Sequence, residues 1–271
     1  NSPYPEHKKN YIFEKKEEFL KIVLFKAFKI VVAHNQNKED LIKIYNCAAS
    51  KILVQTFIPY LPNISNDDLN FFNNDEKKYI ENLYKNKKII LYPATFWAHK
   101  NHKYIIDSII QLKNRNINNF HFIMCGSDRG TFKYIKKLVE ENKLSDYVTI
   151  FPLVSNLFLK KLYEECFAVI MPTDAGPTNL PLYEAMYFKK PIFYSKNLND
   201  QELKEIIISI DIKNPSDFVN KIIDLKVDNI AKKINLGSIY YKKYCNQNDF
   251  NNLYMNIIRD FKEILSKWRN I

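Results

Sequence analysis

Short apolar runs alternate with amphipathic stretches along most of the chain. From residue 76 onward, the apolar runs predict strands near residues 88–92, 120–125, 147–151, 167–171 and 191–194. Apolar residues at helical spacing predict helices near residues 102–114, 130–142, 156–165, 180–188 and 200–208. Alternating strands and helices are typical of a parallel sheet covered by helices on both faces. The pattern therefore predicts an α/β domain.

The two ends of the chain carry the same kinds of signal. Before residue 60, the pattern predicts a helix, a strand, a helix and a strand, over residues 13–28, 29–33, 37–45 and 51–57. After the break at Asn214-Pro215-Ser216, apolar positions at helical spacing predict helices over residues 217–225 and 248–268. No complete α/β unit precedes residue 90.

The chain is strongly basic, with a formal net charge of +11 and a pI near 9.2. Basic surfaces bind nucleic acids through counterion release. Here, however, only four of the 41 basic residues are arginines, namely Arg115, Arg129, Arg259 and Arg269. We therefore expect no nucleic acid as a partner. The excess lysine favours weak attraction to an anionic membrane leaflet, although a solvated surface explains the charge equally well.

Nothing in the sequence indicates a membrane span or a signal peptide. No apolar run approaches the roughly 20 residues of a transmembrane helix. The four cysteines are widely spaced in mostly apolar surroundings, at Cys47, Cys125, Cys166 and Cys245. We expect reduced thiols and a protein that lies in the cytoplasm or peripherally on the cytoplasmic face of the inner membrane.

The segment from Pro172 to Met186 carries the most specific chemical signal. The apolar run 167–171 predicts a buried strand, and a turn rich in Gly, Pro, Asn and Thr follows it. A helix should begin at Asn179 or Leu180, where free backbone amides and the helix dipole favour a phosphate or diphosphate. Glu184 lies about one turn further, within reach of ligand hydroxyl groups. Alternatively, Asn179 only caps the helix and Glu184 is a solvated residue.

A second strand-loop-helix segment runs from Ile89 to Lys103. Its loop places Lys100 between His99 and His102, behind the aromatic pair Phe96 and Trp97. A lysine at the carboxyl end of a parallel strand can bind a diphosphate as a point charge. Taken alone, Lys100 reads more readily as a surface lysine, because the chain contains many lysines. No cysteine or acidic cluster lies near the histidines, so we expect no metal there.

Together these motifs resemble glycosyltransferase family 4. The resemblance rests on PATFWAHKNH, on the strand end at Phe122–Gly126, on VTIFPLVSNLFLKKLYEEC and on MPTDAGPTNLPLYEAMYFKKPIFYS, in that order, and covers about residues 25 to 265. The family comprises retaining, nucleotide-sugar-dependent enzymes of the GT-B fold. The resemblance thus implies an α/β protein of GT-B type, with a Rossmann-like donor domain that binds the nucleotide sugar.

The resemblance also assigns roles to residues of this chain. It implies that Lys100 contacts the donor diphosphate and that Glu184, the second glutamate of an E-x7-E motif, contacts the donor ribose. Leu153 and Val154 would border the nucleotide base, and Gly126 ends a neighbouring strand of the same site. The turn before Glu184 would offer backbone amides to the phosphates and sugar, at Gly176, Pro177, Thr178, Asn179 and Leu180.

Two positions depart from the family pattern. Gly176 stands where the first glutamate of E-x7-E is expected, and Asp174 is the nearest carboxylate. Thr95 stands where the family usually has an arginine, five residues before Lys100. A subset of bacterial polysaccharide-assembly enzymes resembles the chain in both respects. Which side chain holds the donor sugar hydroxyls stays open.

The resemblance implies four regions in the chain. Residues 1–60 would be a remnant of the N-terminal acceptor-binding domain, residues 61–75 a linker, residues 76–247 the donor domain and residues 248–271 a terminal crossover helix. The glycine-rich loop and histidine that face the acceptor in this family have no counterpart here. We therefore expect a truncated or partial enzyme.

The function implied is transfer of a hexose-type sugar, with retention, from a nucleoside diphosphate sugar to a glycan or lipid-linked acceptor in cell-surface polysaccharide assembly. No Asp-x-Asp pair occurs in the chain, so we expect neither a metal nor another cofactor. Two further classes stay open: a non-catalytic nucleotide-sugar-binding or scaffold fragment, and an unrelated α/β enzyme that binds a phosphate at a helix start.

Overall fold

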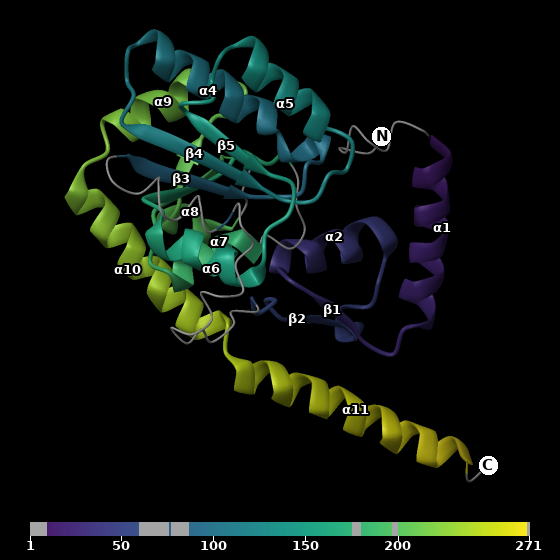
Figure 1. Ribbon diagram of the computed structural model, residues 1–271. Helices are drawn as coiled ribbons and strands as arrows, with labels where there is room; N and C mark the ends of the chain where they lie inside the picture. The colour runs from purple at the N-terminus through teal and green to yellow at the C-terminus, as the bar shows by residue number, and fades with distance from the viewer. Residues whose placement is uncertain (1–9, 60–75, 77–86, 175–179, 197–199, 270–271) are drawn as a thin grey trace. The chain divides into compact units, whose positions relative to one another are not determined.

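The computed structural model describes residues 10–59, 76, 87–174, 180–196 and 200–269 (Figure 1). The described residues fall into two compact units. The smaller comprises those up to Ile58 and those from Ile239 onward, and the larger those from Pro59 to Ser238. Each unit contains its own parallel sheet.

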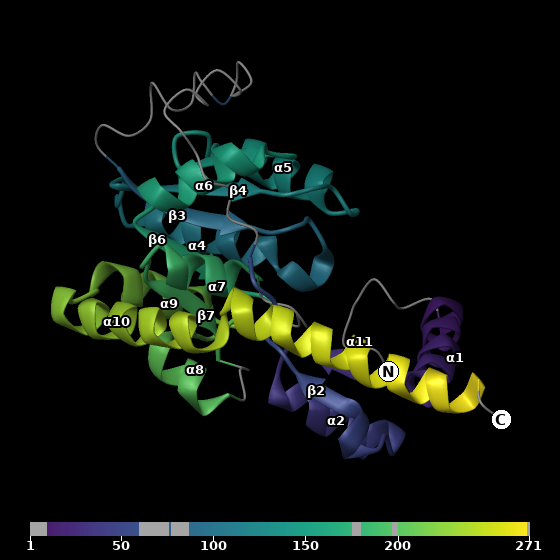
Figure 2. The ribbon, with the colours of Figure 1, turned by 90° about the horizontal axis from the view of Figure 1, so that it is seen from below.

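The larger unit is built on six parallel strands. They are β3 (Lys88–Pro93), β4 (Phe120–Cys125), β5 (Val148–Phe151), β6 (Ala168–Met171), β7 (Ile192–Ser195) and β8 (Ile208–Ile210). They lie in the order β5-β4-β3-β6-β7-β8, and Figure 2 shows β4, β3, β6 and β7 side by side. Numbered within the unit, this order is 3-2-1-4-5-6, which is typical of nucleotide-binding α/β folds.

Helices cover both faces of this sheet (Figure 1). One face carries α4 (His102–Asn114), α5 (Phe132–Glu141) and α9 (Pro215–Ile223). The other carries α6 (Asn156–Glu165), α7 (Leu180–Tyr187) and α8 (Gln201–Ile206). The strands are therefore buried from both sides, and every residue of β4, β6 and β7 is buried. The predicted α/β architecture with a parallel sheet is confirmed.

The strand order reverses between β3 and β6: strands after β3 are added on one side of it, and strands from β6 onward on the other. β3 pairs with β4 on one side and with β6 on the other, where Leu91 lies opposite Val169. The segments after these two strands therefore leave the same edge of the sheet at neighbouring points. In open α/β sheets, ligands bind at the carboxyl ends of strands where the strand order reverses.

The smaller unit is a two-stranded parallel sheet with helices. It contains α1 (Asn10–Lys26), β1 (Ile30–Val32), α2 (Asn35–Tyr45), a 3-10 turn (Ala49–Lys51), β2 (Ile52–Val54) and α11 (Gln247–Arg269). Each helix and strand predicted in the two terminal segments is present, with ends shifted by a few residues. Packing here is sparse, because α2 buries none of its residues and β1 is only half-buried.

Two elements differ from the prediction. The helix expected over residues 200–208 ends at Ile206, and the chain then forms the edge strand β8. No element was predicted for most of α10 (Val227–Tyr244), which contains a glycine in its interior. Gly237 has a packing reason, because an added Cβ would lie 3.2 Å from Ile206 and 3.3 Å from Met186. Tertiary contacts thus override the low helix propensity of glycine.

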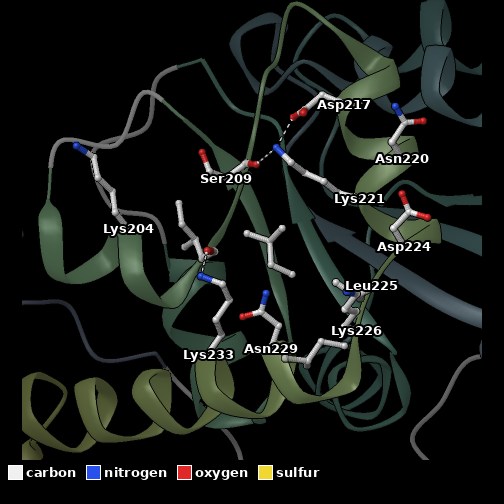
Figure 3. A pocket seen from close by; sticks show the side chains of 13 residues that line it. Lys204, Ser209, Asp217, Asn220, Lys221, Asp224, Leu225, Lys226, Asn229 and Lys233 are labelled. Carbon is white, nitrogen blue, oxygen red and sulfur yellow. Dashed lines mark hydrogen bonds and ion pairs between the residues drawn. The ribbon is translucent and has the colours of Figure 1, made fainter.

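Side chains close the outer edge of the sheet at β8. Lys233 donates to the carbonyls of Glu205 and Ile207, both at 2.8 Å, and Lys221 donates to the carbonyl of Ser209 at 2.7 Å. These lysines line a hollow of about 720 Å³ between β8, α9 and α10 (Figure 3). Lys221 thus covers one carbonyl of the edge strand, and Lys233 pairs two carbonyls at the end of α8, just before that strand.

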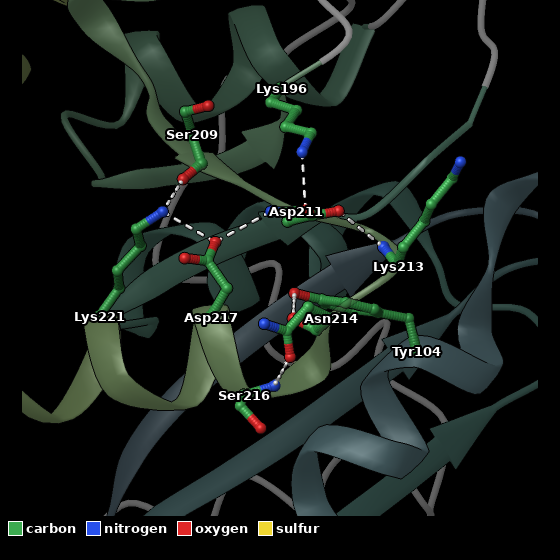
Figure 4. Close-up of polar contacts among 9 residues, drawn as sticks. All are labelled: Tyr104, Lys196, Ser209, Asp211, Lys213, Asn214, Ser216, Asp217 and Lys221. Atoms are coloured by element: carbon green, nitrogen blue, oxygen red, sulfur yellow. Dashed lines mark hydrogen bonds and ion pairs between the residues drawn. The ribbon is translucent and has the colours of Figure 1, made fainter.

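The same edge ends in a small charged network (Figure 4). The Asp217 carboxylate accepts from Lys221 at 2.8 Å and from the backbone N–H of Asp211 at 2.9 Å. The Asp211 carboxylate accepts from Lys196 at 2.6 Å, and this bond holds the pKa of Asp211 below its usual value. The network fixes the start of α9 against the end of β8.

Candidate functional site

The loops that follow β3 and β6 are joined by hydrogen bonds at the carboxyl ends of these strands, where the strand order reverses. The backbone carbonyl of His99 accepts from the Asp174 N–H at 3.0 Å and from the Thr173 hydroxyl at 3.4 Å. Thr173 is buried and Asp174 is exposed. The structure thus brings together the two segments that carry the strongest chemical signals in the sequence.

Lys100 ends the 3-10 turn Ala98–Lys100 and is half-buried. Its backbone carbonyl accepts from the hydroxyl of the buried Tyr92 at 2.6 Å, and its N–H donates to Trp97 at 3.1 Å. The next residue, Asn101, adopts a left-handed conformation with φ of 56° and caps α4. The backbone of Lys100 is therefore held from both sides, which limits where its ammonium group can reach.

A close backbone contact fixes the start of this loop. A Cβ at Gly126 would lie 2.3 Å from the Ala94 carbonyl oxygen and 2.7 Å from the Thr95 nitrogen, so no larger residue fits there. Beyond it, the Phe96 N–H donates to Ser127 at 2.9 Å. The loops after β3 and β4 are thus held in direct contact, and this places Thr95, which is half-buried, beside Gly126.

Glu184 lies on α7 and is engaged by a tyrosine of α6. The Tyr163 hydroxyl donates to Oε2 of Glu184 at 2.5 Å. Burial raises the pKa of Glu184, and the hydrogen bond from Tyr163 opposes that rise. Burial also raises the pKa of Tyr163 well above its usual value, with the charge of Glu184 adding to the effect. Tyr163 therefore stays protonated and acts as a donor.

His102, at the end of the Lys100 loop, has a structural role. His102 stacks on Phe96 with ring centroids 4.2 Å apart, and its Nε2 lies 3.2 Å from the Ala94 carbonyl oxygen. Burial lowers the pKa of His102 to about 3, so its ring is neutral. Within the described part of the chain, no group of three or more His, Cys, Asp or Glu side chains could hold a metal ion.

The loop after β5 contains the two residues expected beside a nucleotide base. Leu153 is 72% exposed and Val154 is half-buried. The next residue, Ser155, caps α6, and its backbone N–H donates to the buried Glu76 carboxylate at 3.0 Å. The buried carboxylate anchors the loop, and the exposed Leu153 is available for a planar ligand.

The candidate site therefore contains most, but not all, of the predicted residues. The structure describes Thr95, Lys100, Gly126, Leu153, Val154, Asp174, Leu180 and Glu184, each at or just beyond the carboxyl edge of the sheet or on α7. The predicted backbone donors Gly176, Pro177, Thr178 and Asn179 lie outside the described residues. Sequence reasoning missed Tyr163, Thr173 and Glu76, because each acts on residues far away in the chain and no local spacing reveals it.

The chain is similar in fold to several solved structures. Sucrose-phosphate synthase from Thermosynechococcus elongatus matches with a TM-score of 0.72 and 18% identity, over 93% of this chain and 62% of that one. TarM from S. aureus, as a mutant solved with fondaparinux, α-GlcNAc-glycerol and UDP, matches with a TM-score of 0.69 and 15% identity. The match covers 90% of this chain and 46% of that one.

WaaG, a glycosyltransferase involved in lipopolysaccharide biosynthesis, matches with a TM-score of 0.58 and 13% identity, over 79% of this chain and 58% of that one. The chain thus spans 46 to 62% of the length of these three proteins. At these identities the similarity establishes the fold, which is of GT-B type. No curated protein sequence matches the chain.

A family model identifies the larger unit more closely. The model of the glycosyl transferases group 1 matches residues 73–238, more than half of the chain. The match ends at the residue where the larger compact unit ends. The chain belongs to this glycosyltransferase family.

Proposed function

We propose that the chain is the donor-binding part of a retaining glycosyltransferase that moves a hexose-type sugar from a nucleoside diphosphate sugar to a glycan or lipid-linked acceptor. The observation that carries the proposal is the junction of the β3 and β6 loops through the His99 carbonyl. This junction ties the loop of Lys100 to the segment that leads into α7 and Glu184.

Each residue has a distinct part in the proposed reaction. Negative charge builds on the diphosphate as the glycosidic bond to the donor sugar breaks. Lys100 stabilises that charge from a fixed backbone, so little reorganisation is needed in the transition state. Glu184 accepts hydrogen bonds from the ribose and fixes the nucleotide. The departing phosphate takes the acceptor proton, so no enzyme nucleophile is required.

Similar solved structures support the choice of ligand. TarM was solved with UDP and a GlcNAc-containing compound, and WaaG acts in lipopolysaccharide biosynthesis. We extend a UDP-sugar donor and a cell-surface glycan acceptor to this chain as part of the proposal. Its setting is the cytoplasm, with peripheral contact to the inner membrane. None of the described helices is long and apolar enough to cross a membrane.

The first experiment identifies the nucleotide. Purified chain is melted with UDP, GDP and ADP and with their glucose and N-acetylglucosamine conjugates, with and without EDTA. A ligand that binds only the folded chain raises the melting temperature. We expect one base to stand out and EDTA to have no effect. If no compound of the panel raises the melting temperature, the donor-binding function is wrong.

The second experiment tests the two residues. Lys100→Ala and Glu184→Ala each remove a charged partner of the nucleotide, so we expect binding of the selected nucleotide to weaken about ten- to a hundredfold by calorimetry. Lys103→Ala is the matched control, because Lys103 is an exposed lysine next to the same loop and is paired with Asp107 at 2.6 Å. Unchanged affinity in both site variants would contradict the assignment.

One alternative function is favoured by a specific observation. The chain spans only 46 to 62% of the proteins named above, so it could bind a nucleotide sugar without completing transfer. Turnover distinguishes the two cases. The catalytic proposal expects release of nucleoside diphosphate from the bound donor that rises with an added glycan acceptor, whereas a binding or scaffold fragment shows affinity without release.

A further inference from the structure

We propose that Tyr163 is a positioning residue that holds the Glu184 carboxylate in place for the donor nucleotide. The inference rests on the proposed role of Glu184 in donor binding. Tyr163 itself touches Glu184, and nothing in the structure requires it to touch the donor. Its effect on the reaction would therefore pass entirely through the glutamate.

Two neighbours fix Tyr163 from one side: Glu184 on α7 and Phe188 directly after that helix. Its ring stacks on Phe188, with centroids 5.3 Å apart and planes at 10°, and its hydroxyl donates to Glu184 at 2.5 Å. The Phe188 N–H donates to the Glu184 carbonyl at 3.0 Å, so the two side chains leave the same side of this segment. Because the Tyr163 ring is fully buried and stacked, its hydroxyl oxygen has a fixed position. The Glu184 carboxylate therefore accepts from a donor that stays in place.

The surroundings make this single contact important. Glu184 is half-buried, and among the described residues the Tyr163 hydroxyl of α6 donates to it while the Cys125 thiol, at the end of β4, interacts with its charge. Burial raises the pKa of the Cys125 thiol to about 12, so the thiol is neutral. The Tyr163 hydrogen bond stabilises the ionised glutamate against the desolvation that disfavours it. Without it, the carboxylate would both move more freely and take up a proton more readily.

The chain contains a matched pair of the same chemistry elsewhere. In the smaller unit, the Tyr45 hydroxyl donates to Glu17, also at 2.5 Å. Both Tyr45 and Glu17 are half-buried, and no predicted donor-binding residue lies in that unit. Tyr45→Phe therefore removes an equivalent bond and serves as the control for Tyr163→Phe.

The test compares wild type, Tyr163→Phe, Tyr45→Phe and Glu184→Gln in two measurements. The first is the pKa of Glu184 in the free protein, by NMR of isotope-labelled glutamate, with its signal assigned by its loss in Glu184→Gln. The second is UDP affinity by calorimetry as a function of pH. The ionisation of UDP itself is common to all variants, so differences between variants report on the protein.

We expect Tyr163→Phe to raise the pKa of Glu184, to weaken UDP binding roughly tenfold at neutral pH and to move the acid limb of the affinity profile to higher pH. Tyr45→Phe should match wild type in both measurements. Phe188→Leu keeps the hydroxyl but removes the stacking surface, and it should shift both quantities in the same direction by less. It keeps the test decisive if Tyr163→Phe folds poorly.

The outcomes separate this inference from the proposed function. A wild-type pKa and a wild-type affinity profile in Tyr163→Phe overturn the positioning role. If Glu184→Gln binds UDP as wild type does, the role of Glu184 in donor binding is wrong, and the positioning role fails with it, whatever the pKa of Glu184 does. A change in affinity without a shift along the pH axis shows that Tyr163 supports only the packing of α6 on α7, which also overturns the positioning role.

Discussion

The two compact units use the same kinds of elements but bury them very differently. In the larger unit, β4, β6 and β7 are buried at every position, and α4 buries seven of its residues. In the smaller unit, α2 buries none, and α1 leaves Phe19 and Phe25 exposed by 69% and 82%. A helical or strand period in the sequence therefore predicts an element without predicting what it packs against.

The same contrast appears in polar contacts. Each unit contains a tyrosine-to-glutamate hydrogen bond of 2.5 Å, Tyr163 to Glu184 and Tyr45 to Glu17. Tyr45 is half-buried whereas Tyr163 is fully buried, so water replaces the first bond at a lower cost than the second. Two hydrogen bonds of the same length thus contribute differently to stability. We therefore expect single substitutions to affect a binding site more strongly in the larger unit.

Removing one core side chain should show the largest difference between the units. Phe193 is fully buried and packs edge-on against Phe218 with centroids 4.9 Å apart. We expect Phe193→Ala to lower the free energy of unfolding by about 3–5 kcal/mol, because it leaves a cavity. Phe25→Ala in the smaller unit should change it by no more than about 0.5 kcal/mol. Urea unfolding followed by circular dichroism measures both, and equal losses would contradict the comparison.

Acid should act next on the larger unit, which holds two buried histidines. Burial lowers the pKa of His102 to about 3 and that of His121 to about 4, from an ordinary value of 6.5. Between these folded-state pKa values and 6.5, the two histidines are therefore protonated in the unfolded chain and neutral in the folded chain. The stability contribution is complete above pH 6.5 and is lost as the pH falls toward the folded values, by about 2 kcal/mol per histidine near pH 5.

A variant checks the origin of this acid sensitivity. His102→Phe keeps a ring on Phe96 but cannot take up a proton. Urea unfolding at several pH values should show a smaller loss of stability between pH 6.5 and 5 in the variant than in wild type. Parallel curves for the two proteins would show that the His102 ring does not contribute.

Much of the larger unit could be predicted from the sequence, for identifiable reasons. Its strands are apolar runs bounded by polar or turn residues, as at Lys88–Pro93, and its helices carry strong periodicity, as at His102–Asn114. β8 escaped prediction because its three residues directly follow a helix without a turn residue between them. An isolated Ile-Ser-Ile cannot be assigned from its own pattern, and only pairing with β7 defines it.

The candidate site could be predicted only in part. Lys100 and Glu184 are predicted because each follows a strand in a segment with a recognisable motif. The contact between their loops, through His99 and Thr173, joins residues 74 positions apart and depends on β3 pairing with β6. Tyr163 has no marker at all, because a tyrosine at an apolar helical position is equally an ordinary core residue. Long-range partners of a site are thus the part that required the structure.

The smallest expected effect separates two lysines with the same bond. Lys233 donates to the carbonyls of Glu205 and Ile207 at the end of α8, and burial lowers its pKa, whereas Lys29 in the smaller unit donates to the Ser50 carbonyl at 2.8 Å in an exposed position. Lys233→Met should cost about 1 kcal/mol of unfolding free energy, because it leaves two partly buried carbonyls without their donor. Lys29→Met should cost at most a few tenths of a kcal/mol. Urea unfolding measures both losses. A loss in Lys29→Met as large as that in Lys233→Met would show that burial does not decide the weight of these bonds.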